Sequence, residues 1–264
     1  MGPGQGAPRD GDALLDGVEL LCLDAGNTVI FLEHARLAAL AASTGHTLSV
    51  DALVACEGEA KRLAETGGLV DLAWAGAGEP GALGWGRMVG TIFSRAGVPS
   101  DALVPLLEAA WRSHVDYNLW SKVPPGLGEA LEAFRATGGR VAIVSNSEGM
   151  LASLFAKLGV ARHFDLVADS GLLGVEKPDP RIFEHVLREL AVPAGAALHL
   201  GDVFATDVLG ARAAGIRAAL IDPFEHYAGR HPDVPRVEGA AQAARALADR
   251  RAARAHPQGE RQEA

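Results

Sequence analysis

Four short polar segments of the sequence follow apolar runs, and each contains side chains that could handle a phosphate group or a metal ion. The first, LCLDAGNTV, places Asp24 directly after an apolar run. A buried carboxylate is costly unless it is paired or bound to a metal, so Asp24 could act as a nucleophile or a metal ligand. It could instead accept hydrogen bonds from the amides of the next turn.

The second and third segments offer groups that bind phosphate. VAIVSNSEG presents Ser145 and Asn146 at a predicted helix start, where backbone N–H groups favour anions. These two residue types are also ordinary helix caps. GVEKPDPRIF places Lys177 before two prolines, where its ammonium could neutralise a phosphoryl group. The alternative for Lys177 is a solvated loop lysine.

The fourth segment, HLGDVFATDVLGARAAG, contains two carboxylates with spacing suited to a hard cation. Asp202 follows an apolar run directly, and Asp207 lies five residues further on. Magnesium prefers oxygen ligands and takes few of them from the protein. The alternative is that Asp202 caps a helix and Asp207 interacts with the helix dipole.

The elements that must position these groups alternate between strands and helices. Short apolar runs predict strands at residues 18–23, 140–144, 165–168, 197–200 and 217–221, with amphipathic stretches at 127–137, 150–158, 180–190 and 206–214. This alternation predicts an α/β fold with a doubly wound parallel sheet. Ligands of such sheets bind beyond the carboxyl ends of the strands, where all four polar segments lie.

The section from residue 32 to residue 122 interrupts this alternation. It predicts four helices near residues 34–43, 50–66, 80–96 and 100–117, and it contains all four tryptophans. We therefore expect a helical domain at 32–122, inserted into a core domain formed by residues 17–31 and 123–250. The polar ends, residues 1–16 and 251–264, are expected to be flexible tails.

Together, the four segments resemble the motifs of the haloacid dehalogenase-like hydrolase superfamily. The resemblance covers about residues 18–225 and rests on the order of the motifs, on their strand-end placement and on the segments KPDPRIF and GDVFATDVLGARAAG. The insertion after the first motif is similar to the helical cap of that superfamily. The implied fold is a Rossmann-like core with an inserted α-helical cap.

The resemblance assigns the nucleophile and the phosphate ligands residue by residue. It implies that Asp24 forms a covalent aspartyl intermediate. Ser145 and Lys177 would hold the phosphoryl group, with Asn146 beside them, and Thr28 would brace the first loop of this phosphate site. A carboxylate nucleophile repels a phosphate dianion unless cations neutralise it, which agrees with these roles.

The resemblance also implies a Mg²⁺ cofactor. Asp24, Asp202 and the backbone carbonyl of Gly26 would bind the ion, and Asp207 would orient this metal site from the same loop as Asp202. Phosphatases of the superfamily carry a second Asp at the position of Gly26, which protonates the leaving group and then activates water. Glycine keeps the carbonyl but has no proton to give, and such acid–base help is worth about 10²–10⁴-fold.

Other residues could supply the missing proton. Glu33 and His34 lie where the chain enters the helical insertion, and His114 and Asp116 lie near its end. Each of them fits a solvated helix face or a hinge position as well. Restoring an Asp at Gly26 is expected to help esters with poor leaving groups most, if this glycine is the sole defect.

Lys61 is one of only four lysines, and it lies within the insertion. Phosphonate-cleaving relatives use an imine-forming lysine in their cap. The surrounding sequence EGEAKRLAE instead predicts an exposed, charged helix face, so Lys61 is not assigned to the site.

Composition limits the remaining functions. The 264 residues are 48% apolar with a net charge of −9, which argues against a nucleic-acid partner, and no apolar run is long enough for a membrane span. The sequence predicts a cytoplasmic, Mg²⁺-dependent phosphohydrolase of a small phosphorylated metabolite, of open oligomeric state. The alternatives are a weakly catalytic or non-catalytic phosphometabolite-binding protein and a carbon–halogen or carbon–phosphorus hydrolase.

Overall fold

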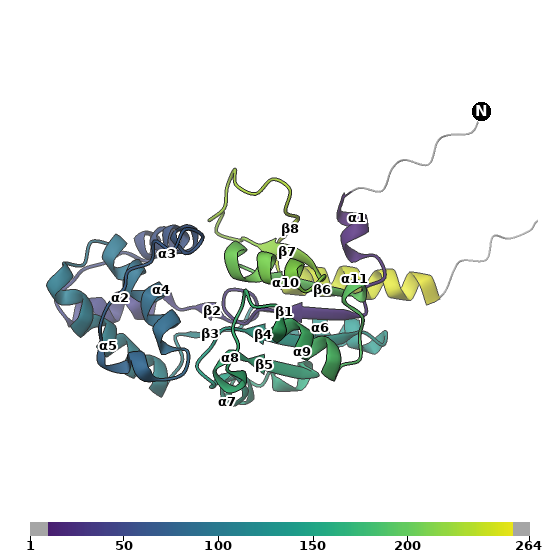
Figure 1. Cartoon of the computed structure of the whole chain (residues 1–264), viewed down its shortest axis with the longest axis horizontal. Helices are drawn as coiled ribbons and strands as arrows, with labels where there is room; N and C mark the ends of the chain where they lie inside the picture. The colour runs from purple at the N-terminus through teal and green to yellow at the C-terminus, as the bar shows by residue number, and fades with distance from the viewer. Residues whose placement is uncertain (1–9, 256–264) are drawn as a thin grey trace, which may run out of the picture.

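The computed structural model describes residues 10–255, and a six-stranded sheet forms their centre (Figure 1). The strand order is β5-β4-β1-β6-β7-β8, and every pairing is parallel. The strands are β1 (Leu20–Leu23), β4 (Arg140–Ser145), β5 (Leu166–Asp169), β6 (Ala197–Gly201), β7 (Arg217–Ile221) and β8 (Arg236–Val237). The prediction of an α/β fold with a parallel sheet is confirmed.

Helices cover both faces of this sheet, which explains why its strands are almost continuously apolar. On one face, Leu21 and Leu23 pack in a hydrophobic cluster with the helices α6 (Leu127–Ala136), α7 (Leu151–Lys157) and α11 (Ala240–Ala255). On the other face, Leu20 and Cys22 pack with α9 (Arg181–Glu189) and α10 (Leu209–Ala213). Successive strand residues point to opposite faces, so one short strand serves both clusters.

A helical insertion separates β1 from β4 in the sequence and forms a third hydrophobic cluster. Its helices are α2 (His34–Ser43), α3 (Val50–Ala64), α4 (Ala82–Arg95) and α5 (Ser100–Asp116), with a 3₁₀ turn at Ala75–Gly78. They start and end close to the predicted positions and lie together at one end of the molecule (Figure 1). The two connecting strands, β2 (Phe31–Leu32) and β3 (Trp120–Lys122), pair antiparallel, so the chain enters and leaves the insertion at one place.

Both predicted tails are wrong in part. Residues 10–15 form the helix α1 (Asp10–Leu15), and Leu14 is buried in the cluster beneath α11, because an apolar side chain at the sheet edge is removed from water there. Helix α11 continues to Ala255 rather than ending at residue 250. Residues 1–9 and 256–264, the remainder of these tails, lie outside the described residues.

Short helical elements complete the core. They are the 3₁₀ turns Ala161–His163 and Ala194–Ala196, the helix α8 (Ser170–Leu173) and a π-helical turn, Phe204–Val208, directly before α10. The sequence predicted one continuous helix from residue 206. The π turn is significant because such turns occur often at functional sites, and it contains Asp207. Among residues 10–255, no helix combines the length and apolar character of a membrane span.

Candidate functional site

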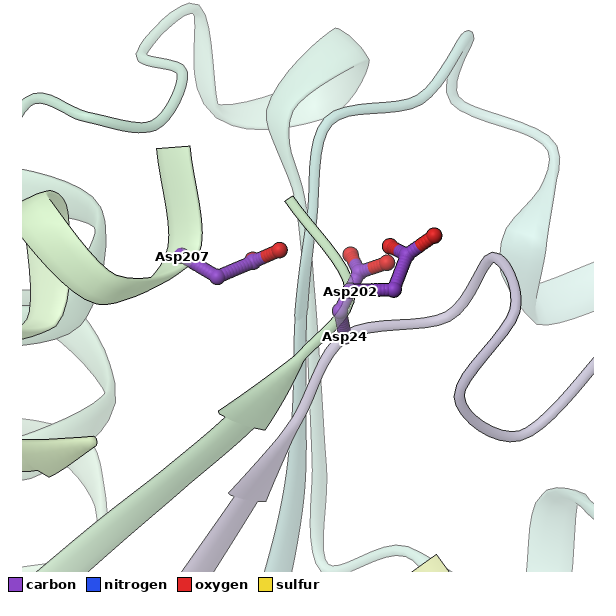
Figure 2. A group of neighbouring side chains, drawn as sticks. All are labelled: Asp24, Asp202 and Asp207. Atoms are coloured by element: carbon purple, nitrogen blue, oxygen red, sulfur yellow. The ribbon is translucent and has the colours of Figure 1, made fainter. Parts of the chain in front are cut away.

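Three carboxylates from two neighbouring strands meet at the carboxyl edge of the sheet (Figure 2). Asp24 follows β1, Asp202 follows β6, and Asp207 projects from the π-helical turn beyond β6. Each offers an oxygen within 4.8 Å of the other two, and all three residues are buried. The parallel pairing of β1 with β6 produces this convergence, because both strands end at the same edge.

Lys177 lies between two of these carboxylates. Its Nζ is 2.6 Å from Oδ1 of Asp24 and 2.5 Å from Oδ1 of Asp207, and the residue is only 3% exposed. The side chain of Asn146 fixes the loop that carries it: the amide nitrogen donates to the Lys177 carbonyl at 2.9 Å, and the amide oxygen accepts from the Lys177 N–H at 2.7 Å. The structure thus brings Lys177 to Asp24, whereas Asn146 holds the lysine backbone.

The carboxylates carry more negative charge than their neighbours neutralise. Burial raises the pKa of Asp24 to about 6, with Asp207 and Asp202 adding to the rise and Lys177 opposing it. Burial also raises the pKa of Asp202. Burial opposes ionisation of Asp207 too, but Lys177 and His199 outweigh it and lower its pKa. The cluster therefore favours an additional cation.

Lys61 corrects the expectation of an exposed helix face. Lys61 is only 3% exposed. Its Nζ lies 2.7 Å from Oδ2 of Asp202, 3.2 Å from Oε1 of Glu57 and 3.1 Å from Nδ1 of His226. The charged face of α3 is buried because it packs against the carboxyl edge of the sheet, where carboxylates replace water as partners of the ammonium. The carboxylates outweigh the effect of burial and raise the pKa of Lys61.

Glu57 is a site residue that sequence reasoning missed. It is 2% exposed and accepts hydrogen bonds from Asn27 and from His34, the latter at 2.7 Å. Burial opposes its ionisation, but Lys61 and His34 more than compensate, and its pKa falls to about 2. The i, i+4 spacing of Glu57 and Lys61, with the scarcity of lysine, was the available signal.

The acidic cluster opens into a cavity of about 330 Å³ between the sheet edge and the insertion. Ser145, at the end of β4, lines it together with Asp24, Gly26 and Lys177. The insertion contributes the polar lining residues Glu57, Lys61, His114 and Asn118. It also contributes an aromatic and apolar part of the wall, which includes Leu69, Trp85, Met88 and Trp120. The other two tryptophans, Trp74 and Trp111, pack edge-on in the interior of the insertion.

Of the four possible proton donors, only His114 lines this cavity. His34 is buried against Glu57, Glu33 accepts a hydrogen bond from Ser121, and Asp116 is exposed at the end of α5. The imidazole of His114 accepts a hydrogen bond from the Leu119 N–H at Nδ1, and its Nε2 lies 3.4 Å from Glu148. The polar atoms of His114 are therefore engaged away from Asp24.

Thr28 lies in the loop after Asp24 but is not among the residues that line the cavity. It is 1% exposed, and its hydroxyl has no hydrogen-bond partner among residues 10–255. Gly26, by contrast, lies on the cavity wall and pairs with Ile30 in a single bridge that tightens the loop after Asp24.

The fold and the site together are those of a Rossmann-like α/β core that brings a strand-end aspartate, a lysine and an acidic cluster to one edge of its sheet. Residues 18–215 match the family model described as haloacid dehalogenase-like hydrolase, and the chain belongs to this family. It is 33% identical to haloacid dehalogenase-like hydrolase domain-containing protein 3 of Mus musculus over 138 residues, which cover 52% of this chain and 55% of that protein.

Two further comparisons extend the range of similar proteins. The phosphoserine phosphatase of Thermus thermophilus is 34% identical over 137 residues, covering 52% of this chain and 53% of that enzyme. The chain thus spans about half the length of the curated relatives it matches. The structure of YfnB, a HAD-type hydrolase of Bacillus subtilis solved with magnesium, superposes with a TM-score of 0.62 at 16% identity. That alignment covers 87% of this chain and 98% of YfnB and shows a shared fold.

Proposed function

We propose that this protein is a Mg²⁺-dependent phosphohydrolase that cleaves a small phosphorylated metabolite through a phosphoaspartyl intermediate on Asp24. The observation that carries the proposal is the placement of Lys177 between Asp24 and Asp207, with Asp202 alongside. This arrangement provides a nucleophile, a fixed cation and an acidic metal site in one cavity. The similarity to a protein named phosphoserine phosphatase supports a phosphorylated small molecule as the substrate class.

The residues present fit magnesium. Four buried carboxylates, Asp24, Glu57, Asp202 and Asp207, face only two ammonium groups, so the site has surplus negative charge and hard oxygen ligands. Asp24, Asp202 and Asp207, with the Gly26 carbonyl, would hold the ion. When bound, Mg²⁺ supplies charge neutralisation for the phosphoryl oxygens.

The protein's own groups would divide the remaining work. Lys177 and the hydroxyl of Ser145 would orient the phosphoryl group in front of Asp24, as positively charged and hydrogen-bonding ligands. An oxygen of Asp24 attacks phosphorus while the bond from phosphorus to the leaving oxygen breaks. Water then attacks the phosphorus of the intermediate, the aspartate departs as a carboxylate, and both protons of the water remain on the phosphate product.

The helical insertion would act as a cap over this chemistry. Lys61 reaches Asp202 from α3, and Trp85 and Met88 from α4 line the same cavity. A cap in this position excludes water and determines which leaving groups fit. We therefore propose residues 32–122 as the cap domain, and 17–31 with 123–250 as the core domain that α1 and the end of α11 extend.

A panel of phosphate esters tests the proposal. The full chain should release phosphate from at least one ester in Mg²⁺ and lose this activity in EDTA. Asp24→Asn keeps the size of the side chain but removes the nucleophile, so it should be inactive, and Asp165→Asn on the sheet's opposite edge is the matched control. Equal activity in EDTA and in Mg²⁺, or an active Asp24→Asn variant, would contradict the proposed mechanism.

Carbon–phosphorus hydrolysis is the second candidate, because Lys61 lies in the cavity rather than in solvent. An imine-forming lysine must react as the neutral amine, however, and the carboxylates around Lys61 raise its pKa. Treatment with borohydride in the presence of a carbonyl-bearing phosphonate would trap such an imine as a stable adduct on Lys61. Absence of the adduct, with ester hydrolysis intact, rejects this candidate.

Binding with little turnover is the third candidate, and Gly26 is the residue that favours it. Under this hypothesis, phosphate esters would raise the melting temperature of the protein in Mg²⁺ while no phosphate is released. The ester panel therefore separates a binding protein from a hydrolase.

A further inference from the structure

Trp120 fills the space beside Gly26, where the superfamily's phosphatases carry their acid. A Cβ added to residue 26 would lie 3.2 Å from Nε1 and 3.3 Å from Cδ1 of Trp120, and 3.9 Å from Oδ2 of Asp24. The N–H edge of the indole therefore faces the space next to the nucleophile. These contacts are tighter than ordinary van der Waals contact, so a side chain at position 26 would force the indole to shift by a few tenths of an ångström.

The position of Trp120 follows from its place in the connection to the insertion. It begins β3, where it lies opposite Leu32 of β2, and its backbone N–H donates to the Asn118 side chain at 2.8 Å. The ring packs against the hydrophobic clusters of the core and of the insertion and lines the cavity. Its Nε1 has no hydrogen-bond partner among residues 10–255, and it is not one of the fully buried polar atoms.

The charged side chains that α3 contributes to the cavity are fully engaged in hydrogen bonds and ion pairs. The three partners of Lys61 are Asp202, Glu57 and His226, which match the three donors of an ammonium group. Glu57 accepts hydrogen bonds from three side chains and is held as the carboxylate. The Ser145 hydroxyl is assigned above to the phosphoryl group, and Ser147 and Trp85 each line the cavity with a polar atom that lacks a partner. Unlike these donors, the indole N–H of Trp120 belongs to the atoms nearest to position 26, beside Asp24. It is therefore the donor placed to meet the oxygen that leaves when Asp24 attacks phosphorus.

An indole N–H donates a hydrogen bond but does not give up its proton. The leaving oxygen would therefore depart with its electron pair as an oxyanion, stabilised by the hydrogen bond from Trp120. Only groups that form stable oxyanions leave readily in this way. The wall formed by Leu69, Trp85, Met88 and Trp120 favours planar, apolar leaving groups.

We propose that Trp120 donates a hydrogen bond from its indole N–H to the departing oxygen, in place of the absent acid. The substrates are then phosphate esters of aromatic or enolic hydroxyl groups. This inference rests on the phosphohydrolase function proposed above. Gly26 is then the partner that makes room for the indole, rather than a defect. In the first step Asp24 takes the phosphoryl group and the aryl or enol oxyanion departs unprotonated, so the charge is conserved.

The dependence of rate on the leaving group tests this proposal in the full chain with Mg²⁺. Substituted phenyl phosphates of graded phenol acidity and two alkyl phosphates of similar size serve as substrates. We expect kcat/KM to fall steeply as the phenol becomes less acidic, and alkyl phosphates to react at least about 10²-fold more slowly than phenyl phosphate, the low end of what an acid would supply.

Trp120→Phe keeps an aromatic ring but removes the N–H. A hydrogen bond to a developing oxyanion is worth about 1.5–3 kcal/mol, so kcat/KM for phenyl phosphates should fall roughly 10- to 100-fold. The loss should be largest for the least acidic phenols, because their oxyanions need the hydrogen bond most. Trp111→Phe, within the insertion and away from the cavity lining, is the matched control and should retain wild-type rates.

A double substitution at positions 26 and 120 can also introduce the acid that the superfamily's phosphatases carry. Gly26→Asp alone should lower activity on phenyl phosphates, because its Cβ meets the indole. Combined with Trp120→Ala, which clears the space, the new carboxyl group should raise alkyl phosphate turnover relative to phenyl phosphate by at least tenfold. Melting temperatures of all variants verify that each is folded.

Three results would overturn the proposal. Alkyl and phenyl phosphates hydrolysed within tenfold of each other, or a Trp120→Phe variant with the wild-type leaving-group dependence, would remove the role of Trp120 while leaving the Mg²⁺-dependent phosphohydrolase intact. Absence of hydrolysis for every ester would instead refute the proposed function and this inference together.

Discussion

Replacing Lys61 by Met tests whether the insertion and the metal site are electrostatically joined. Met retains most of the length and apolar volume of the side chain but removes its charge. In the structure the ammonium lies 2.7 Å from Asp202 and 3.2 Å from Glu57, with all three residues buried. The variant would therefore leave two buried carboxylates without their main cation.

The size of the effect follows from these distances. At an effective dielectric constant of about 20, two unit charges 2.7 Å apart attract by roughly 6 kcal/mol. Desolvation of the three groups offsets much of this attraction, and removal of one partner from a buried pair typically costs about 3–5 kcal/mol. For a chain of this size that loss lowers the melting temperature by roughly 10 °C.

Although Lys61→Met should be less stable than the wild type without metal, it should bind Mg²⁺ more tightly. Lys61 occupies Oδ2 of Asp202, so the cation must displace or share this contact when it binds. The Lys61→Met variant should bind Mg²⁺ at least about tenfold more tightly than the wild type, because no ammonium competes with the ion for Asp202. This change corresponds to about 1.4 kcal/mol of binding free energy. Its melting temperature in saturating Mg²⁺ should then recover most of the loss seen in EDTA.

Thermal melts in EDTA and in graded Mg²⁺, together with calorimetric titration of the metal, measure both quantities. Lys157→Met on α7 is the matched control, because Lys157 is exposed and should change neither result. A Lys61→Met variant that melts like the wild type in EDTA would refute the reasoning. Weaker Mg²⁺ binding in that variant would equally show that Lys61 supports the metal rather than competes with it.

Three further predictions concern other groups. Asp202→Ala should abolish detectable Mg²⁺ binding by calorimetry while the circular dichroism spectrum stays that of the folded protein; retained binding would exclude Asp202 as a ligand. Lys177→Ala should weaken vanadate or phosphate inhibition by roughly 1.5–3 kcal/mol, as expected for a charge-assisted contact, and unchanged inhibition would place the anion elsewhere. Burial opposes ionisation of Asp165, but hydrogen bonds from Arg135 and from the Val141 N–H lower its pKa. The stabilisation from Asp165 should therefore be complete above about pH 4, the usual pKa range of an Asp side chain, and disappear as the pH falls further. The urea midpoints of wild type and Asp165→Asn should converge only below about pH 4, and a gap that does not narrow there would contradict this sign.

The sequence by itself determined the sheet and the convergence of the acidic groups. Five of the six strands are short apolar runs that end in a polar residue or at a turn, and parallel strands must end at one edge. Asp24 and Asp202 therefore had to meet once the runs before them were recognised as neighbouring strands. Local patterning also placed the four helices of the insertion within a few residues, because each is amphipathic and bounded by breakers.

Only the tertiary structure decided which way the insertion faces. Periodicity puts Glu57 and Lys61 on one face of α3, but a charged helix face is equally compatible with water or with opposite charges on another element. Packing of α3 over the carboxyl edge of the sheet supplies those charges and buries the face. Gly26 is a second example. In the sequence it marks only the absence of the acid expected at that position. In the structure the ring of Trp120, 94 positions away along the chain, lies so close that a side chain at position 26 would press against it.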